Sequence, residues 1–132
     1  YKMVTLDLLY GTPQFPLSNL GVVYYELKEY ELSAQYYLKA LDINPEFVQA
    51  LYGLAKTYME MDRVPDAIVK LQTAVGISPD SAVLHFELAR AYALDRQYTK
   101  ALNAYHKVAE INPSSTLADR ALIEARKIKN RK

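Results

Sequence analysis

Apolar residues recur at helical spacing in two consecutive segments between Val48 and Pro79. The first segment carries Leu51, Leu54, Ala55 and Tyr58, and the second carries Ala67, Ile68, Leu71, Ala74 and Val75. Residues three and four apart share one face of a helix, so each segment predicts a helix with one apolar side. The break between them ends at Pro65, a residue type favoured at the first position of a helix. This stretch therefore predicts a helix–turn–helix unit whose second helix begins at Pro65.

The same pattern repeats every 34 residues along the chain, as the prolines at positions 45, 79 and 113 show. Six further sets keep this step: Leu20, Leu54 and Leu88; Gly21, Ala55 and Ala89; Tyr24, Tyr58 and Tyr92; Ser33, Ala67 and Ala101; Tyr37, Leu71 and Tyr105; Ala40, Ala74 and Val108. A fixed period of about 20 to 50 residues indicates a solenoid, in which neighbouring units bury each other's apolar faces.

The period predicts an all-α fold of antiparallel helix pairs. Helices are expected near residues 14–28 and 31–44, 47–61 and 65–77, and 81–95 and 98–111, because a residue before proline is disfavoured in a helix. This gives repeats at 14–47, 48–81 and 82–115. A last helix near 115–130 has one apolar stripe, so 116–132 are expected to form a capping helix and basic tail. Residues 1–13 are interpreted as the remnant of a truncated upstream repeat.

The period, the Leu-Gly/Ala-x-x-Tyr and Ala-x-x-x-Tyr/Leu-x-x-Ala patterns and the closing proline resemble the tetratricopeptide repeat. The resemblance covers about residues 14–113 as three full repeats, with His85 as the one unusual residue at a position held elsewhere by Leu17 and Leu51. It implies an α-α superhelix whose first helices line a concave groove. Proteins of this kind are non-catalytic scaffolds that bind an extended or helical peptide of a partner protein in that groove.

In the first helix of each repeat, the residues assigned to packing leave one side of the helix to line the groove. The tyrosines at 24, 58, 92, 37 and 105 are assigned to the core, whereas Tyr25, Tyr36 and Tyr52 are expected to face outward. The candidate groove residues are Phe15, Val22, Tyr25, Gln49, Tyr52, Lys56, Met59, Phe86 and Arg90. Aromatic and Met side chains supply adaptable apolar area, and Lys56 and Arg90 share one register as two cations. We expect a peptide with an apolar anchor and an acidic group; the alternative is a mixed amphipathic face without a ligand.

Resemblance to particular members of this family allows two more specific functions to be considered, of which the first is the capture of heat-shock protein tails. Tetratricopeptide co-chaperones that bind heat-shock protein tails use Lys, Asn and Arg at positions held here by Ser18, Val22, Gly53, Val83 and Glu87, so tail capture is not expected.

The segment from Leu9 to Gly21 is similar to the repeat entry of bacterial pilotin-like lipoproteins of type IV pilus and secretin assembly. That likeness indicates a bacterial source, and the sequence does not distinguish between a location in the cytoplasm and one in the periplasm. A third possibility is self-association through the amino-terminal edge, at Leu6 and Leu9.

Composition argues against other classes of function. The chain has no cysteine, its two histidines lack a partner at metal-ligand spacing, and its glycines form no phosphate loop, so no enzyme, metal or cofactor is expected. A net charge of +1 disfavours a general nucleic-acid binder. No apolar run is long enough for a membrane span. Basic residues gather from Arg120 onward and are either a solvated helix end or a contact for nucleic acid or anionic lipid.

Overall fold

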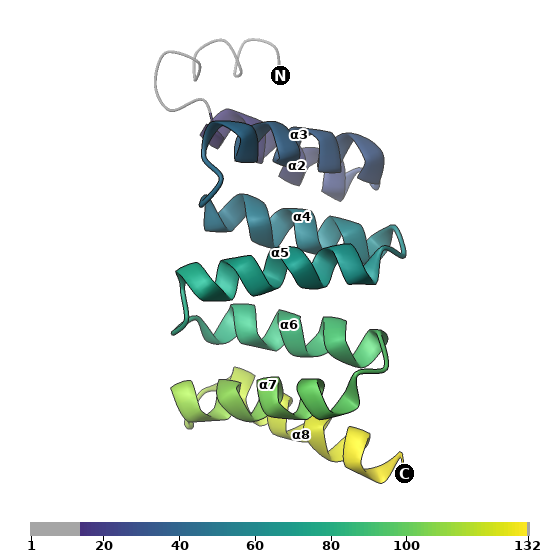
Figure 1. Cartoon of the computed structure of the whole chain (residues 1–132), viewed down its shortest axis with the longest axis vertical. Coiled ribbons are helices and arrows are strands. Elements are labelled where there is room, and N and C mark those ends of the chain that lie inside the picture. The colour runs from purple at the N-terminus through teal and green to yellow at the C-terminus, as the bar shows by residue number, and fades with distance from the viewer. Residues whose placement is uncertain (1–13, 132) are drawn as a thin grey trace. The chain divides into compact units, whose positions relative to one another are not determined.

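A computed structural model describes residues 14–131, with side chains from Pro16 onward. Within this range the chain forms helices and no strand (Figure 1): α2 (Gln14–Glu26), α3 (Tyr30–Ile43), α4 (Val48–Glu60), α5 (Val64–Ile77), α6 (Ala82–Leu94), α7 (Tyr98–Ile111) and α8 (Thr116–Asn130). Every helix expected from the apolar pattern is present, within two residues of its predicted ends. The predicted remnant at residues 1–13, including Leu6 and Leu9, lies outside the described residues.

The chain divides into two compact units, with the boundary between Lys70 and Leu71 inside α5. In the first unit α3 packs against both α2 and α4, and α2 also contacts α4. In the second unit α7 packs against both α6 and α8, and α6 also contacts α8. The capping helix α8 therefore closes the second unit as the sequence predicts.

The turn inside each helix pair has one residue in the left-handed region of the backbone. Lys28, Asp62 and Arg96 have φ angles of 62°, 60° and 63°, and they lie 34 positions apart. The next backbone N–H in each turn donates to a carbonyl near the helix end, for example Gln97 to Tyr92 at 2.9 Å. This is the Schellman arrangement, which satisfies carbonyls that the helix leaves unpaired. No glycine marks these turns, so residue type alone did not locate the left-handed positions.

Proline and serine set the ends of the helices between repeats. Asn44, which precedes Pro45, has extended angles of φ −138° and ψ 94°, and α3 ends just before it. The Ser81 and Ser115 side chains cap α6 and α8 by accepting from the backbone N–H of Leu84 and Ala118. The predicted start of α5 is wrong by one residue, because Val64 is already helical and Pro65 takes the second position. Proline fits there because the first turn lacks internal N–H partners.

Tyr37 fills the centre of the first unit, between two glycines. A Cβ atom added at Gly21 would lie 2.7 Å from Tyr37 Cζ, and one at Gly53 would be closer still. The Tyr37 ring therefore occupies the space that side chains at these positions would need, and it is 4% exposed. Glycine lowers helix propensity, and the closeness of the Tyr37 ring explains why this position inside α4 is nonetheless a glycine.

Two hydroxyls extend this buried region of the first unit. Ser33 Oγ donates to the Gly21 carbonyl at 2.7 Å, and Thr57 Oγ1 donates to the Gly53 carbonyl at 2.8 Å. Both side chains are fully buried, so each hydroxyl needs such a partner. Ser33 takes the register that Ala67 and Ala101 hold in the later repeats. The hydrogen bond explains how a polar residue replaces alanine there.

Candidate peptide-binding surface

A lysine lies over two tyrosine rings on the first helices of the first unit. Tyr52 and Lys56 are four residues apart in α4 and therefore share one face of that helix. The Lys56 Nζ atom is 5.1 Å from the centroid of the Tyr52 ring and 5.2 Å from that of Tyr25, which α2 supplies. The contact between α2 and α4 brings these side chains together. All three residues are among the predicted groove residues, but the contact of one ammonium with both rings could not be predicted from the sequence.

The cluster continues to the start of α3. The Tyr25 ring meets the Tyr30 ring edge-on, with centroids 5.6 Å apart and an interplanar angle of 68°. The Tyr30 hydroxyl donates to Glu60 Oε1 at 3.5 Å. Desolvation by burial is the larger cause that raises the pKa of Tyr30, and the charge of the Glu60 carboxylate and the hydrogen bond to it raise this pKa further. Aromatic, cationic and acidic groups therefore lie side by side on one surface of this unit.

The electrostatics of Lys56 favour an incoming anion. Each tyrosine ring presents its negative face to the ammonium, an attraction of about 0.5 to 1 kcal/mol at partly exposed sites. No ion pair among residues 14–131 involves Lys56. Its side chain is half-buried against the rings, which limits the entropy lost when the ammonium binds a carboxylate.

The remaining predicted residues of the first unit vary in exposure. Val22 is 47% exposed, Gln49 is exposed, and Met59 is half-buried. These residues lie on the same two first helices as the Tyr25–Tyr52–Lys56 cluster. The side chain of Phe15 lies outside the described residues, so its place in a groove stays a prediction.

Phe86 does not present its ring to solvent, which corrects one expectation. It is 4% exposed, its ring meets Tyr105 edge-on with centroids 5.5 Å apart, and the Arg120 guanidinium lies 4.9 Å above it. Within its own repeat Phe86 lies on the side of α6 that faces away from the packing registers, which is why the sequence predicts an exposed ring. The capping helix α8, which supplies Arg120, covers it.

Arg90 is exposed but already has a partner. Its Nη1 atom donates to Glu87 Oε1 at 2.6 Å, one turn earlier in α6. Glu87 is 8% exposed, so this ion pair compensates a largely buried carboxylate. Arg90 therefore has an ion pair that Lys56 lacks among residues 14–131, and its role as a second cation for a ligand stays a prediction. The Glu87–Arg90 spacing of three residues in the sequence was the signal for the pair.

Neither histidine lies in a reactive cluster. His85 Nε2 donates to the Pro79 carbonyl at 2.8 Å, which ties the start of α6 to the preceding turn. Within the described residues no three His, Asp or Glu side chains form a group that could hold a metal ion. No helix among residues 14–131 is long and apolar enough to cross a membrane.

Comparisons with known proteins place this arrangement of helices in a family. Sequence models of the tetratricopeptide repeat match residues 16–47, 36–69 and 82–115, together about two thirds of the chain. The chain is 29% identical to anaphase-promoting complex subunit 3 of Schizosaccharomyces pombe and 31% identical to human DnaJ homolog subfamily C member 7. These alignments cover 77% and 82% of this chain, but only 17% and 23% of the relatives.

Solved tetratricopeptide domains share the fold. The first such domain of Spaghetti (RPAP3), bound to the HSP90 peptide SRMEEVD, has a TM-score of 0.82 at 20% identity, with 89% of this chain and 90% of that chain covered. The Sgt2 domain from Aspergillus fumigatus has a TM-score of 0.82 at 25% identity, with coverage of 92% and 84%. The expected all-α repeat fold is thereby confirmed, and this fold is generally a non-catalytic interaction module. The chain belongs to the tetratricopeptide-repeat family.

Proposed function

We propose that this chain is a protein-interaction scaffold that binds a peptide segment of a partner protein on the first helices α2 and α4. The observation that carries the proposal is the placement of Lys56 over the Tyr25 and Tyr52 rings, 5.2 Å and 5.1 Å from their centroids. Tyrosine is among the residues that dominate the binding energy of many protein interfaces, and a neighbouring ammonium adds attraction for an acidic group. Here they converge from two helices that pack against each other.

The chemistry of this cluster defines the ligand. An apolar anchor residue of the peptide packs on the tyrosine rings and on the exposed Val22, where burial of apolar area favours binding. A neighbouring Asp or Glu pairs with the Lys56 ammonium, a charge-assisted contact that also fixes the register of the peptide. Because Phe86 is buried and Arg90 is paired with Glu87, we assign both parts of recognition to the first unit.

We infer that the ligand differs from the HSP90 tail bound by the Spaghetti domain. The family's tail-binding positions correspond here to Ser18, Gly53 and Glu87, among others. Ser18 is 6% exposed, Gly53 faces Tyr37, and Glu87 is an acid in an ion pair with Arg90. None of these three positions supplies a cation or an amide for the peptide's carboxylates, so SRMEEVD is expected to bind at least about tenfold more weakly than a peptide selected for this chain.

The other possible roles have less support. Self-association through Leu6 and Leu9 stays a prediction, because these residues lie outside the described part of the chain. The pilotin-like role and bacterial source also stay predictions, and the two curated relatives come from a fission yeast and from human. No observation in the described residues favours a catalytic role over binding.

A peptide-display selection tests the proposal without a known partner. Selected peptides are measured by fluorescence anisotropy against the unmodified chain and against Tyr52→Ala and Lys56→Glu variants. The controls are Tyr36→Ala and Lys39→Glu, because Lys39 lies 5.0 Å over the Tyr36 ring on α3 and forms the same kind of pair. All variants are first compared by circular dichroism and thermal melting.

We expect selected peptides to combine an acidic and an apolar residue. The α4 variants should weaken binding at least about tenfold, because each removes a central contact, while the α3 variants leave binding nearly unchanged. SRMEEVD serves as the comparison peptide in the same measurement. An equal loss of peptide affinity in the α4 and α3 variants, or tight binding of SRMEEVD, would contradict this assignment of the site.

A further inference from the structure

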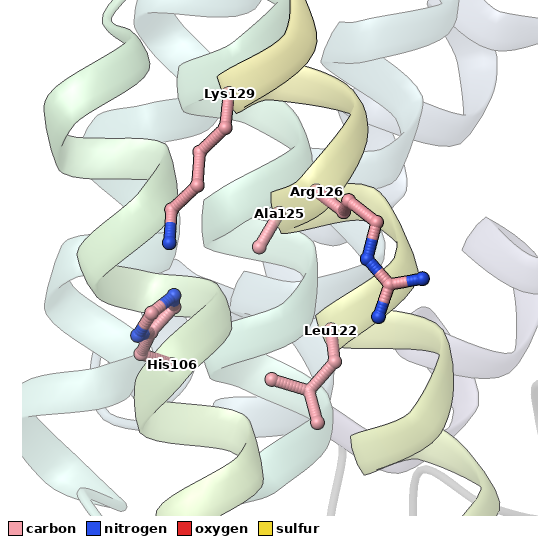
Figure 2. A pocket seen from close by; sticks show the side chains of 5 residues that line it. All are labelled: His106, Leu122, Ala125, Arg126 and Lys129. Atoms are coloured by element: carbon pink, nitrogen blue, oxygen red, sulfur yellow. The ribbon is translucent and has the colours of Figure 1, made fainter.

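A cleft between α7 and α8 in the second unit is lined by basic side chains and an apolar surface. Its volume is about 360 Å³, and its lining residues are His106, Leu122, Ala125, Arg126 and Lys129. Figure 2 shows the Lys129 side chain extending from α8 toward the His106 ring on α7, with Ala125 and Leu122 along the α8 wall. Among the described residues, no carboxylate contributes to this lining. The cleft is thus suited to an anionic group that also carries apolar surface.

The basic residues of α8 fall on two sides of the helix. Leu122, Arg126 and Lys129 follow the helical spacing of four and three residues and therefore share the side that borders α7. On another side Lys127 Nζ pairs with Glu124 at 3.2 Å. The Arg120 and Arg131 guanidinium groups lie over the rings of Phe86 and Tyr98. Only the first of these two sides leaves cations available for a ligand.

Within the described part of the chain, Arg126 and Lys129 have no ion pair. Both are exposed, and the adjoining Leu122 is 43% exposed. Long basic side chains next to an exposed leucine recognise a ligand that is both acidic and apolar. The division of charge over two sides of α8 disfavours a membrane or duplex surface, which requires cations spread over one broad face.

We propose that this cleft is a second binding site, which takes an acidic, leucine-bearing segment of a partner protein. A carboxylate of the segment accepts hydrogen bonds from Lys129 Nζ and from a protonated nitrogen of the His106 ring, and Arg126 binds a second carboxylate. An apolar side chain of the segment packs on Leu122 and Ala125. The site uses none of the residues of the Tyr25–Tyr52–Lys56 cluster, so it stands independently of the proposed function.

The test uses two short peptides with blocked ends on the full chain. In the first peptide glutamate alternates with leucine, and in the second glutamine replaces every glutamate. Lys129→Glu is the test variant. Lys127→Glu is the matched control, because it changes the net charge equally on the same turn but faces Glu124 rather than the cleft. Amide NMR spectra locate the contact, and fluorescence anisotropy measures affinity.

We expect the glutamate peptide to shift the amide signals of His106, Leu122 and Ala125. Lys129→Glu should weaken binding at least about tenfold, with a smaller effect of Lys127→Glu and weaker binding of the glutamine peptide. Absence of binding, shifts confined to the first unit, or equal effects of both variants would overturn the proposal. If the chain sediments with phosphatidylserine vesicles and does not respond to the glutamate peptide, the proposal is likewise overturned and the cleft is assigned to membrane binding.

Discussion

At the scale of single residues, the stability of the first unit depends on one tyrosine and two glycines. Tyr37 lies so close to the Gly21 and Gly53 backbones that a methyl group at either position meets its ring. In repeat two the register of Tyr37 is held by Leu71, a smaller side chain. The large ring and the two glycines are therefore best understood as one packing solution, in which each residue requires the others.

Gly53→Ala is expected to lower the free energy of unfolding by about 1 to 3 kcal/mol, because overpacking outweighs the gain in helix propensity. In a Tyr37→Leu background the same change should cost at least about 1 kcal/mol less, since the clashing ring is absent. Urea denaturation of the four proteins in this double-mutant cycle measures the coupling. Additive effects would show that Tyr37 does not account for the requirement for glycine.

At the scale of the helical elements, each pair is joined through a left-handed residue that is not glycine. Lys28, Asp62 and Arg96 occupy this conformation, which costs a residue with a Cβ atom roughly 1 kcal/mol relative to glycine. The hydrogen bonds of the Schellman turn maintain the conformation. These turns are consequently places where the chain carries strain that a simple substitution can relieve.

Arg96→Gly is expected to raise the stability of the chain by about 0.5 to 1 kcal/mol, seen as a higher midpoint in thermal melting. Lys107→Gly provides a charge-matched control, because it also removes one exposed cation but places glycine inside α7. That control should be destabilising by about 0.7 kcal/mol. A lower midpoint for Arg96→Gly would show that the arginine makes a compensating contribution to the turn.

At the scale of the whole molecule, each unit contains a buried tyrosine whose ionisation opposes folding. Burial raises the pKa of Tyr37 to about 12 and, in the second unit, that of Tyr105 to about 12. An unfolded tyrosine has a pKa of about 10, so the unfolded chain releases these protons first. The contribution of both protonated tyrosines to the free energy of unfolding is fully present below pH 10 and is lost as the pH rises toward 12.

The free energy of unfolding should therefore fall by about 1 kcal/mol per pH unit for each tyrosine between pH 10 and 12. Thermal melting across this range, together with the ultraviolet absorbance of tyrosinate, measures the decline. Tyr37→Phe and Tyr105→Phe remove the ionising hydroxyls while keeping the rings, so the decline should become shallower in each variant. An unchanged slope in both variants would assign alkaline unfolding to other groups.

The repeat, the order of the helices and the helix ends to within two residues all follow from the sequence pattern. Apolar residues at 34-residue steps and proline between repeats act through local backbone physics, which depends little on distant contacts. The tetratricopeptide assignment followed from these local features.

Which side chains remain available to a ligand depends on how the helices pack together. Phe86 and Arg90 lie on the side of their helix that was predicted to face the groove. However, α8 covers Phe86, and Glu87 forms an ion pair with Arg90. Lys56 contacts Tyr25 only because α2 and α4 pack together. A helical period specifies the side of a helix on which a residue lies. The neighbouring helix and the nearest opposite charge determine whether that residue is buried, paired or exposed.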